Sequence, residues 1–418
     1  MTGTKFSGIA SIGEIPAHWK IYRIKSLLSL RSEKNSGDRD LLSVYLDRGV
    51  ISYNDSDGMQ VHKPSADLSN YQNVHIGDFV LNNQQAWRGS VGVSKYDGII
   101  SPAYFVFSLS DKCDPDYMNF LLRDGSMVQQ YETASRGVGT IQRNLYALWF
   151  YESLVALPPL AEQRCIADFL NTKCAEIDAL TADIQTQIDT LEQYKRSVIT
   201  ETVTKGLNPN AEMKDSGVFY MAPMNASWRL TKIGYICTKL SRSFVSEDAA
   251  LICSNKGKVQ VRADDLTGIM VSDDNAMQGI REGDIAIHGM DTWHGAIALS
   301  EFDGKITRVV HVCDSTEDKR FIVYYMQHLA FQGVYKLISN GVRGNTSDFR
   351  SWDKVCDIWI AIPKTRQEQE AICDYLDRQC NAVEEVISTK KQQLEVLATY
   401  KKSLIFEYVT GKKKVPLS

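Results

Sequence analysis

The fold is decided by the stretch LAEQRCIADFLNTKC at residues 160–174, which returns as RQEQEAICDYLDRQC at residues 366–380. The second stretch follows about 206 residues after the first, a period too long for the stacked repeats of a solenoid. Identical pairs include Glu162 and Glu368, Gln163 and Gln369, Ile166 and Ile372, Asp168 and Asp374, Leu170 and Leu376, Cys174 and Cys380, and Val203-Thr204 and Val409-Thr410. The sequence therefore predicts a duplicated half-molecule.

Length and composition are those of a soluble protein with more than one domain. The chain has 418 residues, more than one hydrophobic core usually supports, and 44% of them are hydrophobic. No apolar run approaches the roughly 18 residues that cross a bilayer. Residues 1–6 lack the apolar stretch of a secretory signal. We therefore expect a cytoplasmic protein.

The cysteine spacing argues against a disulfide framework or a zinc site, and the net charge offers no argument for nucleic-acid binding. The nine cysteines are scattered without a CxxC pair, so reduced core thiols are favoured over a zinc site or a disulfide framework. The formal net charge is −4 and the sequence pI is about 6.0, so no general positive field attracts nucleic acid. Either the chain binds no nucleic acid, or partner subunits supply much of the electrostatics.

Both repeated blocks, around residues 159–207 and 364–411, have the pattern of long helices. Apolar residues recur every seven positions, which is the heptad signal of a coiled coil. This stripe consists of Leu170, Ile177, Ile184, Leu191 and Val198 in the first block, and of Leu376, Val383, Leu397 and Leu404 in the second. We expect Leu180, Ile188 and Tyr194 to fill the second seam of the first block.

The ends and the centre of these blocks carry further signals. Pro159 and Pro363 precede the blocks, and Gly206 and Gly411 follow them, as expected for helix starts and stops. Lys390 interrupts the second stripe, where an ion either extends to solvent or fixes the register at some cost in stability. About 40 helical residues make a rod of roughly 60 Å. Two such rods are expected to pack antiparallel about a pseudo-two-fold axis, with one globular segment at each end.

The chain thus divides into four segments and is expected to be α+β. These are residues 1–157 (domain 1), 158–207 (central helical region), 208–362 (domain 2) and 363–418 (C-terminal helical region). The two domains contain short β-rich runs broken by Gly, Asn and Asp, which predict mixed α/β domains with a curved sheet. Trp87-Arg88-Gly89 in domain 1 matches Trp293-His294-Gly295 in domain 2, whereas the polar residues just before them differ. That difference is expected if each domain reads a different target.

Two polar segments of each domain are candidates for nucleic-acid contact. Asn and Gln are suited to adenine edges and Arg to guanine edges, although polar turn residues account for such runs as well. Glycine-rich loops precede both long helices and are either ordinary turns or contacts to a phosphate backbone. The candidates are Gln84, Gln85, Arg88, Arg136, Arg143 and Asn144 in domain 1, and His294, Arg343, Asn345 and Thr346 in domain 2.

The sequence offers little support for catalysis or metal binding. The seven histidines form no HExxH or other paired-ligand pattern, and no nucleophile frame is present. Asp303 followed by Glu317-Asp318-Lys319 loosely imitates the acidic constellation of a metal-dependent nuclease, but domain 1 has no equivalent. We therefore predict a non-catalytic chain.

The helical regions resemble those of a known family. Residues 158–166 read PPLAEQRCI, the first helix closes with YKRSVI and VTKG, and the chain opens with IGEIPAHW at residues 12–19. These phrases resemble the DNA specificity (S) subunits of type I restriction-modification systems, in the order target-recognition domain, conserved helix, target-recognition domain, conserved helix. The second copy departs from the pattern, because it lacks the second proline and the leucine, and because Lys390 interrupts its stripe.

The resemblance implies a double-stranded-DNA-binding subunit whose two domains each read one half of a bipartite site. It implies that the helices set the gap between the halves and dock two modification subunits, which carry S-adenosylmethionine. ATP-dependent restriction subunits, with ATP and Mg²⁺, join through them, and no cofactor is expected on this chain. The alternatives from other classes are a coiled-coil adaptor joining two protein-binding domains and a self-contained metal-dependent nuclease.

Overall fold

The computed structural model describes residues 3–35, 37, 39–56, 64–65, 67–137, 143–262, 274–339 and 349–416. Its contacts divide into two compact units. Unit 1 comprises residues 1–184 and 392–418, and unit 2 comprises residues 185–391. Each unit therefore combines one globular domain with part of both long helices. The four-segment division by sequence cuts the chain differently and stays a prediction.

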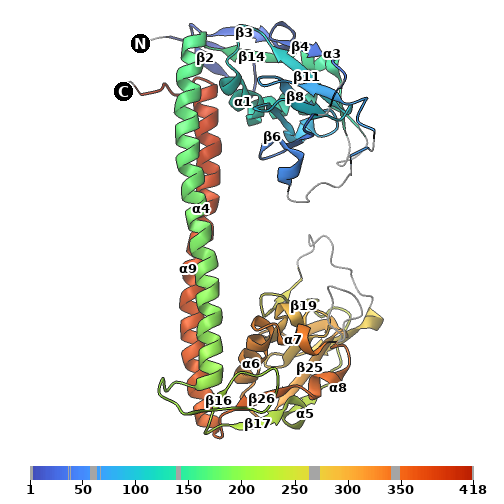
Figure 1. The fold of residues 1–418 in the computed structure, drawn as a ribbon, viewed down its shortest axis with the longest axis vertical. Coiled ribbons are helices and arrows are strands. Elements are labelled where there is room, and N and C mark those ends of the chain that lie inside the picture. Colours follow the sequence, from blue (N-terminus) through green and yellow to red (C-terminus); the bar gives the residue numbers. More distant parts are fainter. Residues whose placement is uncertain are drawn as a thin grey trace. The chain divides into compact units, whose positions relative to one another are not determined.

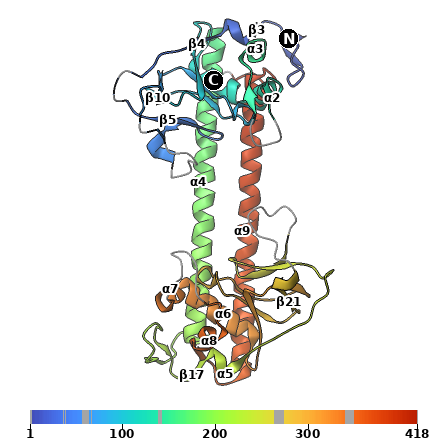
Figure 2. The same ribbon diagram turned by 90° about the vertical axis from the view of Figure 1, so that its right-hand side faces the viewer.

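The two predicted long helices are confirmed as α4 (Leu160–Lys205) and α9 (Arg366–Val409). Each begins shortly after proline and ends at a glycine in the left-handed region, with φ of +84° at Gly206 and +72° at Gly411. In each unit the two helices lie side by side and run in opposite directions (Figure 1 and Figure 2). In unit 1 the beginning of α4 packs against the end of α9, where the rings of Phe169 and Tyr408 are 4.6 Å apart.

The globular part of unit 1 is built from short antiparallel strands and three helices. A four-stranded sheet has the order β4-β11-β8-β9, and the remaining strands pair two by two as β1-β2, β3-β14, β5-β6, β7-β10 and β12-β13. The strands are β1 (Thr4–Phe6), β2 (Glu14–Pro16), β3 (Lys20–Arg23), β4 (Leu28–Arg31), β5 (Leu42–Tyr45), β6 (Gly49–Ser52), β7 (Gln72–Val74), β8 (Phe79–Asn82), β9 (Val91–Val93), β10 (Gly98–Ile100), β11 (Tyr104–Leu109), β12 (Ser135–Arg136), β13 (Asn144–Leu145) and β14 (Leu154–Leu157). The helices are α1 (Pro115–Arg123), α2 (Gly125–Thr133) and α3 (Ala147–Tyr151), with single 3₁₀ turns at η1 (Ile24–Ser26), η2 (Tyr53–Ser56) and η3 (Ala86–Arg88).

Unit 2 repeats this plan. Its four-stranded sheet has the order β18-β25-β22-β23, and its two-stranded pairs are β15-β16, β17-β26, β19-β20 and β21-β24. The strands are β15 (Met213–Lys214), β16 (Met224–Asn225), β17 (Arg229–Lys232), β18 (Cys237–Lys239), β19 (Leu251–Ser254), β20 (Lys258–Val261), β21 (Met277–Ile280), β22 (Ile285–His288), β23 (Ile297–Leu299), β24 (Gly304–Thr307), β25 (Val310–Ser315) and β26 (Trp359–Ile362). The helices are α5 (Ile233–Ile236), α6 (Lys319–Phe331), α7 (Val334–Ile338) and α8 (Trp352–Cys356), with 3₁₀ turns at η4 (Asp274–Ala276) and η5 (Thr292–His294).

The α+β class is confirmed, and each domain contains the expected sheet. Among the described residues, this sheet has four strands in each domain, and several separate two-stranded pairs accompany it. The separate pairs arise from the frequent Gly, Asn and Asp turns, which end the strands after two to six residues. Arg31 in unit 1 and Arg242 in unit 2 each pair with a buried aspartate, Asp78 and Asp284, at the start of a central strand.

The predicted heptad stripe is buried between the two helices. Leu170, Ile177 and Ile184 of α4 are at most 8% exposed, and so are Leu376, Val383 and Leu404 of α9. Leu191, Val198 and Leu397 are half-buried. Full burial of one such side chain stabilises the fold by about 1.5–3 kcal/mol, so this stripe contributes a large part of the helix pairing.

The prediction for the second seam of α4 is wrong in two of three residues. Ile188 is buried, but Leu180 and Tyr194 are 48% and 51% exposed. The second seam runs through positions four residues after each stripe residue, namely Cys174, Thr181, Ile188 and Lys195. Leu180 and Tyr194 each lie three residues after a stripe residue. The seam continues four residues after each stripe residue and reaches the next one three residues later, so Leu180 and Tyr194 are turned away from α9.

Two ion pairs at equivalent positions join the helices. In unit 1 the Lys401 ammonium lies 2.6 Å from an oxygen of Asp178, and in unit 2 the Lys195 ammonium lies 2.5 Å from Glu384. The sequence repeat that matches α4 with α9 also matches Lys195 with Lys401 and Asp178 with Glu384. The same contact is therefore made once in each unit. Lys390, which interrupts the stripe, extends to the side-chain oxygen of Gln187.

A buried tryptophan anchors each domain to both long helices. Trp19 Nε1 donates to Glu162 Oε1 at 3.1 Å, and Trp228 Nε1 donates to Glu368 Oε1 at 2.9 Å. Both indoles are 1% exposed, and hydrogen bonds to charged groups of this kind contribute about 1.5–3 kcal/mol. The other helix reaches the same rings, because a Cβ added at Gly411 would meet Trp19 at 3.1 Å and one added at Gly206 would meet Trp228 at 3.2 Å.

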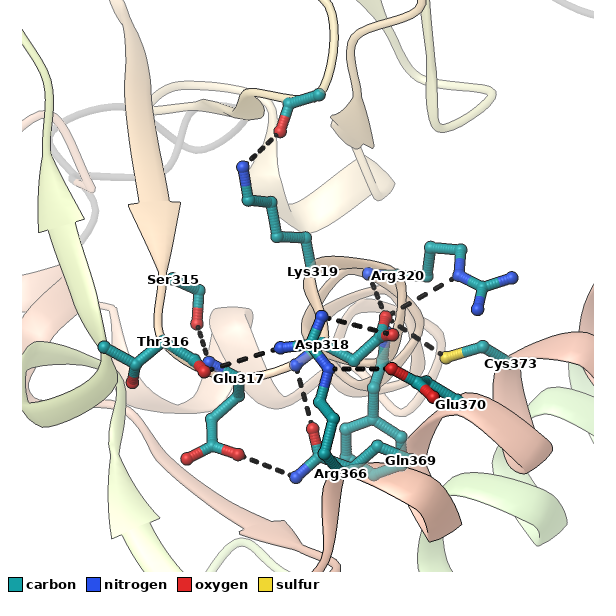
Figure 3. A network of polar contacts seen from close by, with 12 residues as sticks. Ser315, Thr316, Glu317, Asp318, Lys319, Arg320, Arg366, Gln369, Glu370 and Cys373 are labelled. Atoms are coloured by element: carbon teal, nitrogen blue, oxygen red, sulfur yellow. Dashed lines mark hydrogen bonds and ion pairs between the residues drawn. The ribbon is translucent and has the colours of Figure 1, made fainter.

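The glutamine next to each of these glutamates holds a second helix of the domain. Gln163 Oε1 accepts from the backbone N–H of Asp114, the N-cap of α1, at 2.8 Å. In unit 2, Gln369 Oε1 accepts from Asp318 N at 2.8 Å, and Asp318 in turn caps α6 (Figure 3). The Gln369 amide also donates to Glu317 Oε2 at 2.7 Å. The repeated Glu-Gln pair is therefore the joint between the long helices and the domains.

Replacing Gln369 with alanine tests this joint. Gln369→Ala leaves the Asp318 N–H buried without its acceptor, so we expect the first turn of α6 to open more easily, by about 1–3 kcal/mol. Hydrogen exchange of the amides of residues 318–322 is expected to become faster. The matched control is Gln367→Ala, because Gln367 is exposed on the same turn of α9. Equal exchange in both variants would contradict the assignment.

Candidate nucleic-acid interface

In unit 1 the structure brings two of the candidate residues, Arg88 and Arg143, to the ring of Trp87. Trp87 belongs to η3, which follows β8 and ends at Gly89 with φ of +96°. The Arg88 guanidinium lies 5.2 Å from the centre of the Trp87 ring, and the Arg143 guanidinium lies 4.7 Å from it. Two cations thus share one indole, although they are far apart in sequence. Trp87 Nε1 donates to the backbone oxygen of Gln84 at 3.1 Å, which fixes the ring.

The second candidate segment is joined to the first. The backbone N–H of Leu145 donates to Asn83 Oδ1 at 3.0 Å, so the β12-β13 pair is held beside the end of β8. Arg136 and Asn144 are register partners in that pair. The Arg136 guanidinium lies 4.2 Å from the centre of the Trp149 ring. Stacked cations and aromatic rings of this kind suit both phosphate contact and base stacking.

Exposure differs among the six domain 1 candidates. Gln84, Arg88, Arg136 and Asn144 are exposed, whereas Gln85 and Arg143 are half-buried. Arg143 is also paired with Glu132 at 3.0 Å, so part of its charge is already neutralised. Gln85 precedes η3, and its backbone oxygen accepts from Arg88 N at 3.0 Å. The four exposed side chains are the ones free to approach a ligand.

Sequence reasoning missed the aromatic residues of this cluster. The match between Trp87 and Trp293 predicts a structural role for this tryptophan in both domains, and the candidate residues include neither Tyr146 nor Trp149. Their rings are 5.4 Å apart, and they are 50% and 42% exposed. Large aromatics with this exposure next to arginines are typical of binding surfaces. The signal available in the sequence was the run YALWFY at residues 146–151, which is unusually aromatic for a polar surface.

Domain 2 has the same tryptophan-containing turn as domain 1, with different polar side chains around it. Trp293 replaces Trp87, and the Lys336 ammonium lies 5.9 Å from the centre of its ring. His294 stands where domain 1 has Arg88, and its side chain is 48% exposed. Asp291 stands where domain 1 has Gln85, and it lies 3.2 Å from His288 and 3.9 Å from His294. The candidates Arg343, Asn345 and Thr346 lie outside the described residues.

The histidine beside Asp291 is held in its neutral form. Burial lowers the pKa of His288, and the Asp291 carboxylate opposes this effect only in part. His288 Nδ1 accepts from the backbone N–H of Asp291 at 3.1 Å, which requires an unprotonated nitrogen. The cluster in domain 2 is therefore less cationic at neutral pH than its counterpart in domain 1.

The His288 environment predicts a specific titration. We expect the His288 ring to titrate below its ordinary pKa of 6.5, and Asp291→Asn to lower the pKa further because the opposing carboxylate is lost. The pKa of His288 is therefore higher in the unfolded chain than in the folded chain, so the unfolded chain binds the proton more readily. As the pH falls through 6.5, protonation of His288 in the unfolded chain lowers the free energy of unfolding. Ring resonances followed by NMR measure both effects. A pKa that rises in Asp291→Asn would contradict the geometry.

The acidic residues of the nuclease alternative have structural partners. Asp318 is 4% exposed and caps α6, accepting from Arg320 N at 2.9 Å. Glu317 accepts a hydrogen bond from Gln369 (Figure 3). Glu317 also pairs with Arg229, and Lys319 pairs with Asp314 at 2.7 Å. Within the described part of the chain, no group of three or more His, Cys, Asp and Glu side chains is arranged to hold a metal ion. Nor, in that part, does any helix combine the length and hydropathy of a membrane span.

Comparison with known proteins finds similarity in sequence and in fold over nearly the whole chain. A protein of Methanocaldococcus jannaschii, assigned as the type I restriction enzyme MjaX specificity subunit, is 23% identical over 97% of this chain and 96% of its own length. A chain from a structural study of complex assembly and conformational transition of the type I R-M system has a TM-score of 0.68, at 16% identity, over 96% of this chain and 99% of its own. This chain is similar in sequence and fold to type I specificity subunits.

The similarity to type I specificity subunits spans both domains and both long helices. No protein-family model matches the chain. The crystal structure of the HsdS subunit from Thermoanaerobacter tengcongensis aligns over 96% of this chain and 98% of its own, with a TM-score of 0.48 and 16% identity.

Proposed function

We propose that this chain is the DNA specificity subunit of a type I restriction-modification complex. Domain 1 and domain 2 each read one half of a bipartite double-stranded site, and α4 and α9 set the gap between the halves. The outer faces of these helices dock two modification subunits, which bind S-adenosylmethionine, and restriction subunits with ATP and Mg²⁺ join through them. The chain itself is non-catalytic, binds none of these cofactors and works in the cytoplasm.

The observation that carries the proposal is a repeated joint that holds two different surfaces. Trp19 with Glu162 and Trp228 with Glu368 attach the two domains to the helices in the same way. The corresponding polar side chains differ, because Arg88 in domain 1 is matched by His294 in domain 2. A subunit that reads two unlike half-sites needs this combination, since the frame fixes position while the side chains select bases.

Charge distribution supports a binding mode that relies on local clusters. The net charge of −4 gives no general attraction to DNA, but Arg88, Arg136 and Arg143 lie together on aromatic rings in unit 1. In the proposed function Arg136 and Arg343 position the DNA backbone, while Gln85 and Arg88 face base edges. Gln84, Arg143 and Asn144 contribute further contacts from domain 1, and His294, Asn345 and Thr346 contribute them from domain 2. Modification subunits closing around the duplex supply the remaining grip.

Mapping methylated adenines tests the proposal directly. A genome that expresses this chain with its modification subunit is expected to carry methylation at one bipartite site with two unlike halves. In the Arg88→Ala variant we expect the first half-site to relax at one position, by about 1–3 kcal/mol of discrimination, and the second half-site to stay unchanged. Arg23→Ala is the control, because Arg23 is an exposed arginine of the same domain that pairs with Glu152.

The two alternatives predict different results. A coiled-coil adaptor produces no bipartite methylation and no protected half-sites in footprints made with the modification subunits present. A metal-dependent nuclease cuts DNA as the purified chain with Mg²⁺, and Glu317→Ala stops the cutting. Either result would replace the proposed function.

Helix length tests the spacing role separately. Inserting one heptad in α4 after Thr186 and a matching heptad in α9 after Gln392 keeps both seams in phase. Seven helical residues add about 10 Å, which corresponds to about three base pairs of B-DNA. We expect both half-site sequences to be retained and the gap between them to lengthen by about this amount in the methylation map. Retention of the original gap would show that the helices do not set the spacing.

A further inference from the structure

Unit 2 contains a cavity of about 400 Å³ whose lining includes none of the residues assigned above to base reading. Its walls come from the middle of α4, from α9, from the turn between β19 and β20, and from α6 (Figure 1). The five cationic side chains of the lining are Lys195, Arg196, Lys256, Lys258 and Lys391. Only two lining side chains, Glu192 and Glu384, are acidic.

One of these carboxylates is fully engaged by two of the cations. Lys195 Nζ donates to Glu384 Oε1 and Lys258 Nζ donates to Glu384 Oε2, each at 2.5 Å. Burial alone would raise the pKa of Glu384, but the two ammonium groups hold it below its ordinary value. The carboxylate therefore stays ionised and links the β19-β20 turn to both helices.

The remaining cations leave the cavity with an excess of positive charge. The Arg196 guanidinium lies 5.3 Å from the centre of the Phe331 ring, an uncharged partner. Lys256 and Lys391 are exposed, and within the described part of the chain neither is recorded in an ion pair. Glu192 alone offsets these three cations. The cavity is therefore suited to an anion, which ammonium and guanidinium groups bind through charge-assisted hydrogen bonds.

Two of the cations occur in unit 2 alone. In the β5-β6 hairpin Gly49 is the register partner of Tyr45, and in the β19-β20 hairpin Lys258 is the register partner of Ser254, so Gly49 and Lys258 occupy the same place. Unit 1 therefore has a glycine where unit 2 has Lys258. On the helices, the offset that matches Glu162 with Glu368 also matches Gln185 with Lys391. The cationic cavity is thus an addition to the duplicated plan and not part of its frame.

The position of the cavity relative to η5 indicates which anion it receives. Gly295, which ends η5, lines the cavity, and the residue before it is His294, the proposed reading residue of domain 2. A duplex whose base edges reach His294 brings its sugar-phosphate backbone close to the cavity. Phosphate contacts from lysine, arginine and amide side chains fix the register of a protein on DNA without reading sequence.

We propose that this cavity is a backbone-phosphate site that anchors the duplex beside the half-site read by domain 2. This inference rests on the proposed function. Lys256 and Lys391 contact the phosphate, while Lys195, Lys258 and Glu384 hold the walls in place. The anchor is one-sided, because unit 1 has Gly49 and Gln185 at the positions that match Lys258 and Lys391.

The test compares two double variants in the full complex with modification subunits. Lys256→Ala with Lys391→Ala removes the proposed contacts, and Lys5→Ala with Lys364→Ala removes the same charge outside the cavity. The DNA-binding constant K falls with salt concentration, and each lost phosphate contact is expected to make the slope of log K against log salt shallower by about 0.9. The slope of the cavity variant is therefore expected to be shallower by up to about two. We expect affinity to fall about tenfold near physiological salt, with both half-site sequences unchanged. Lys256→Arg with Lys391→Arg keeps the charge and is expected to keep the slope.

Ethylation interference identifies the phosphates involved. Ethylation of particular phosphates next to the second half-site is expected to block binding of the wild-type complex and to have no effect on the Lys256→Ala, Lys391→Ala complex. If half-sites are protected but both double variants have the same slope, the phosphate site is refuted and the proposed function stands. If the wild-type complex protects no half-site, the proposed function fails, and this inference fails with it. If inorganic phosphate binds the wild-type chain but not the cavity variant, while the DNA slope is equal in both, the cavity holds a free anion and the inference is overturned.

Discussion

A buried tryptophan N–H that donates to the first-turn glutamate of a long helix is the interaction on which both units depend. Trp19 and Glu162 make this contact in unit 1, and Trp228 and Glu368 make it in unit 2. The glycine that ends the other long helix packs on the same indole, so one ring holds both helices. Because a side chain larger than glycine would meet the ring, the helix ends and the domain are fitted together as one joint.

Around this joint, the duplicated halves have diverged in a graded way. The pairs Lys401 with Asp178 and Lys195 with Glu384 keep the same interhelical contact in both units. Lys258 adds a second cation to Glu384 in unit 2, where unit 1 has Gly49 at the matching position of its hairpin. Contacts that hold the frame are thus repeated, and contacts on open surfaces are not. This pattern fits a subunit whose two halves are attached alike and used differently.

The two reading surfaces illustrate that difference in electrostatic terms. In unit 1, arginines stack on Trp87 and Trp149 and keep their charge at every physiological pH. In unit 2, the residues around Trp293 include His288, which burial keeps neutral, and Asp291, which attracts the neighbouring histidines. A cationic cavity near η5 supplies positive charge that this surface lacks. In the proposed function, this positive charge supplies phosphate contacts to the half-site of domain 2, because such contacts contribute a large share of DNA affinity.

The sequence by itself determined the duplication, the two long helices, their heptad stripe and the family resemblance, because these depend on spacing along the chain. Only the tertiary structure decided that the second seam runs through Cys174 and Ile188, that Trp87 is the shared platform for two arginines, and that Asp318 is a helix cap. These features arise where segments distant in sequence meet, and residue spacing carries no information about which side chains share a surface after folding.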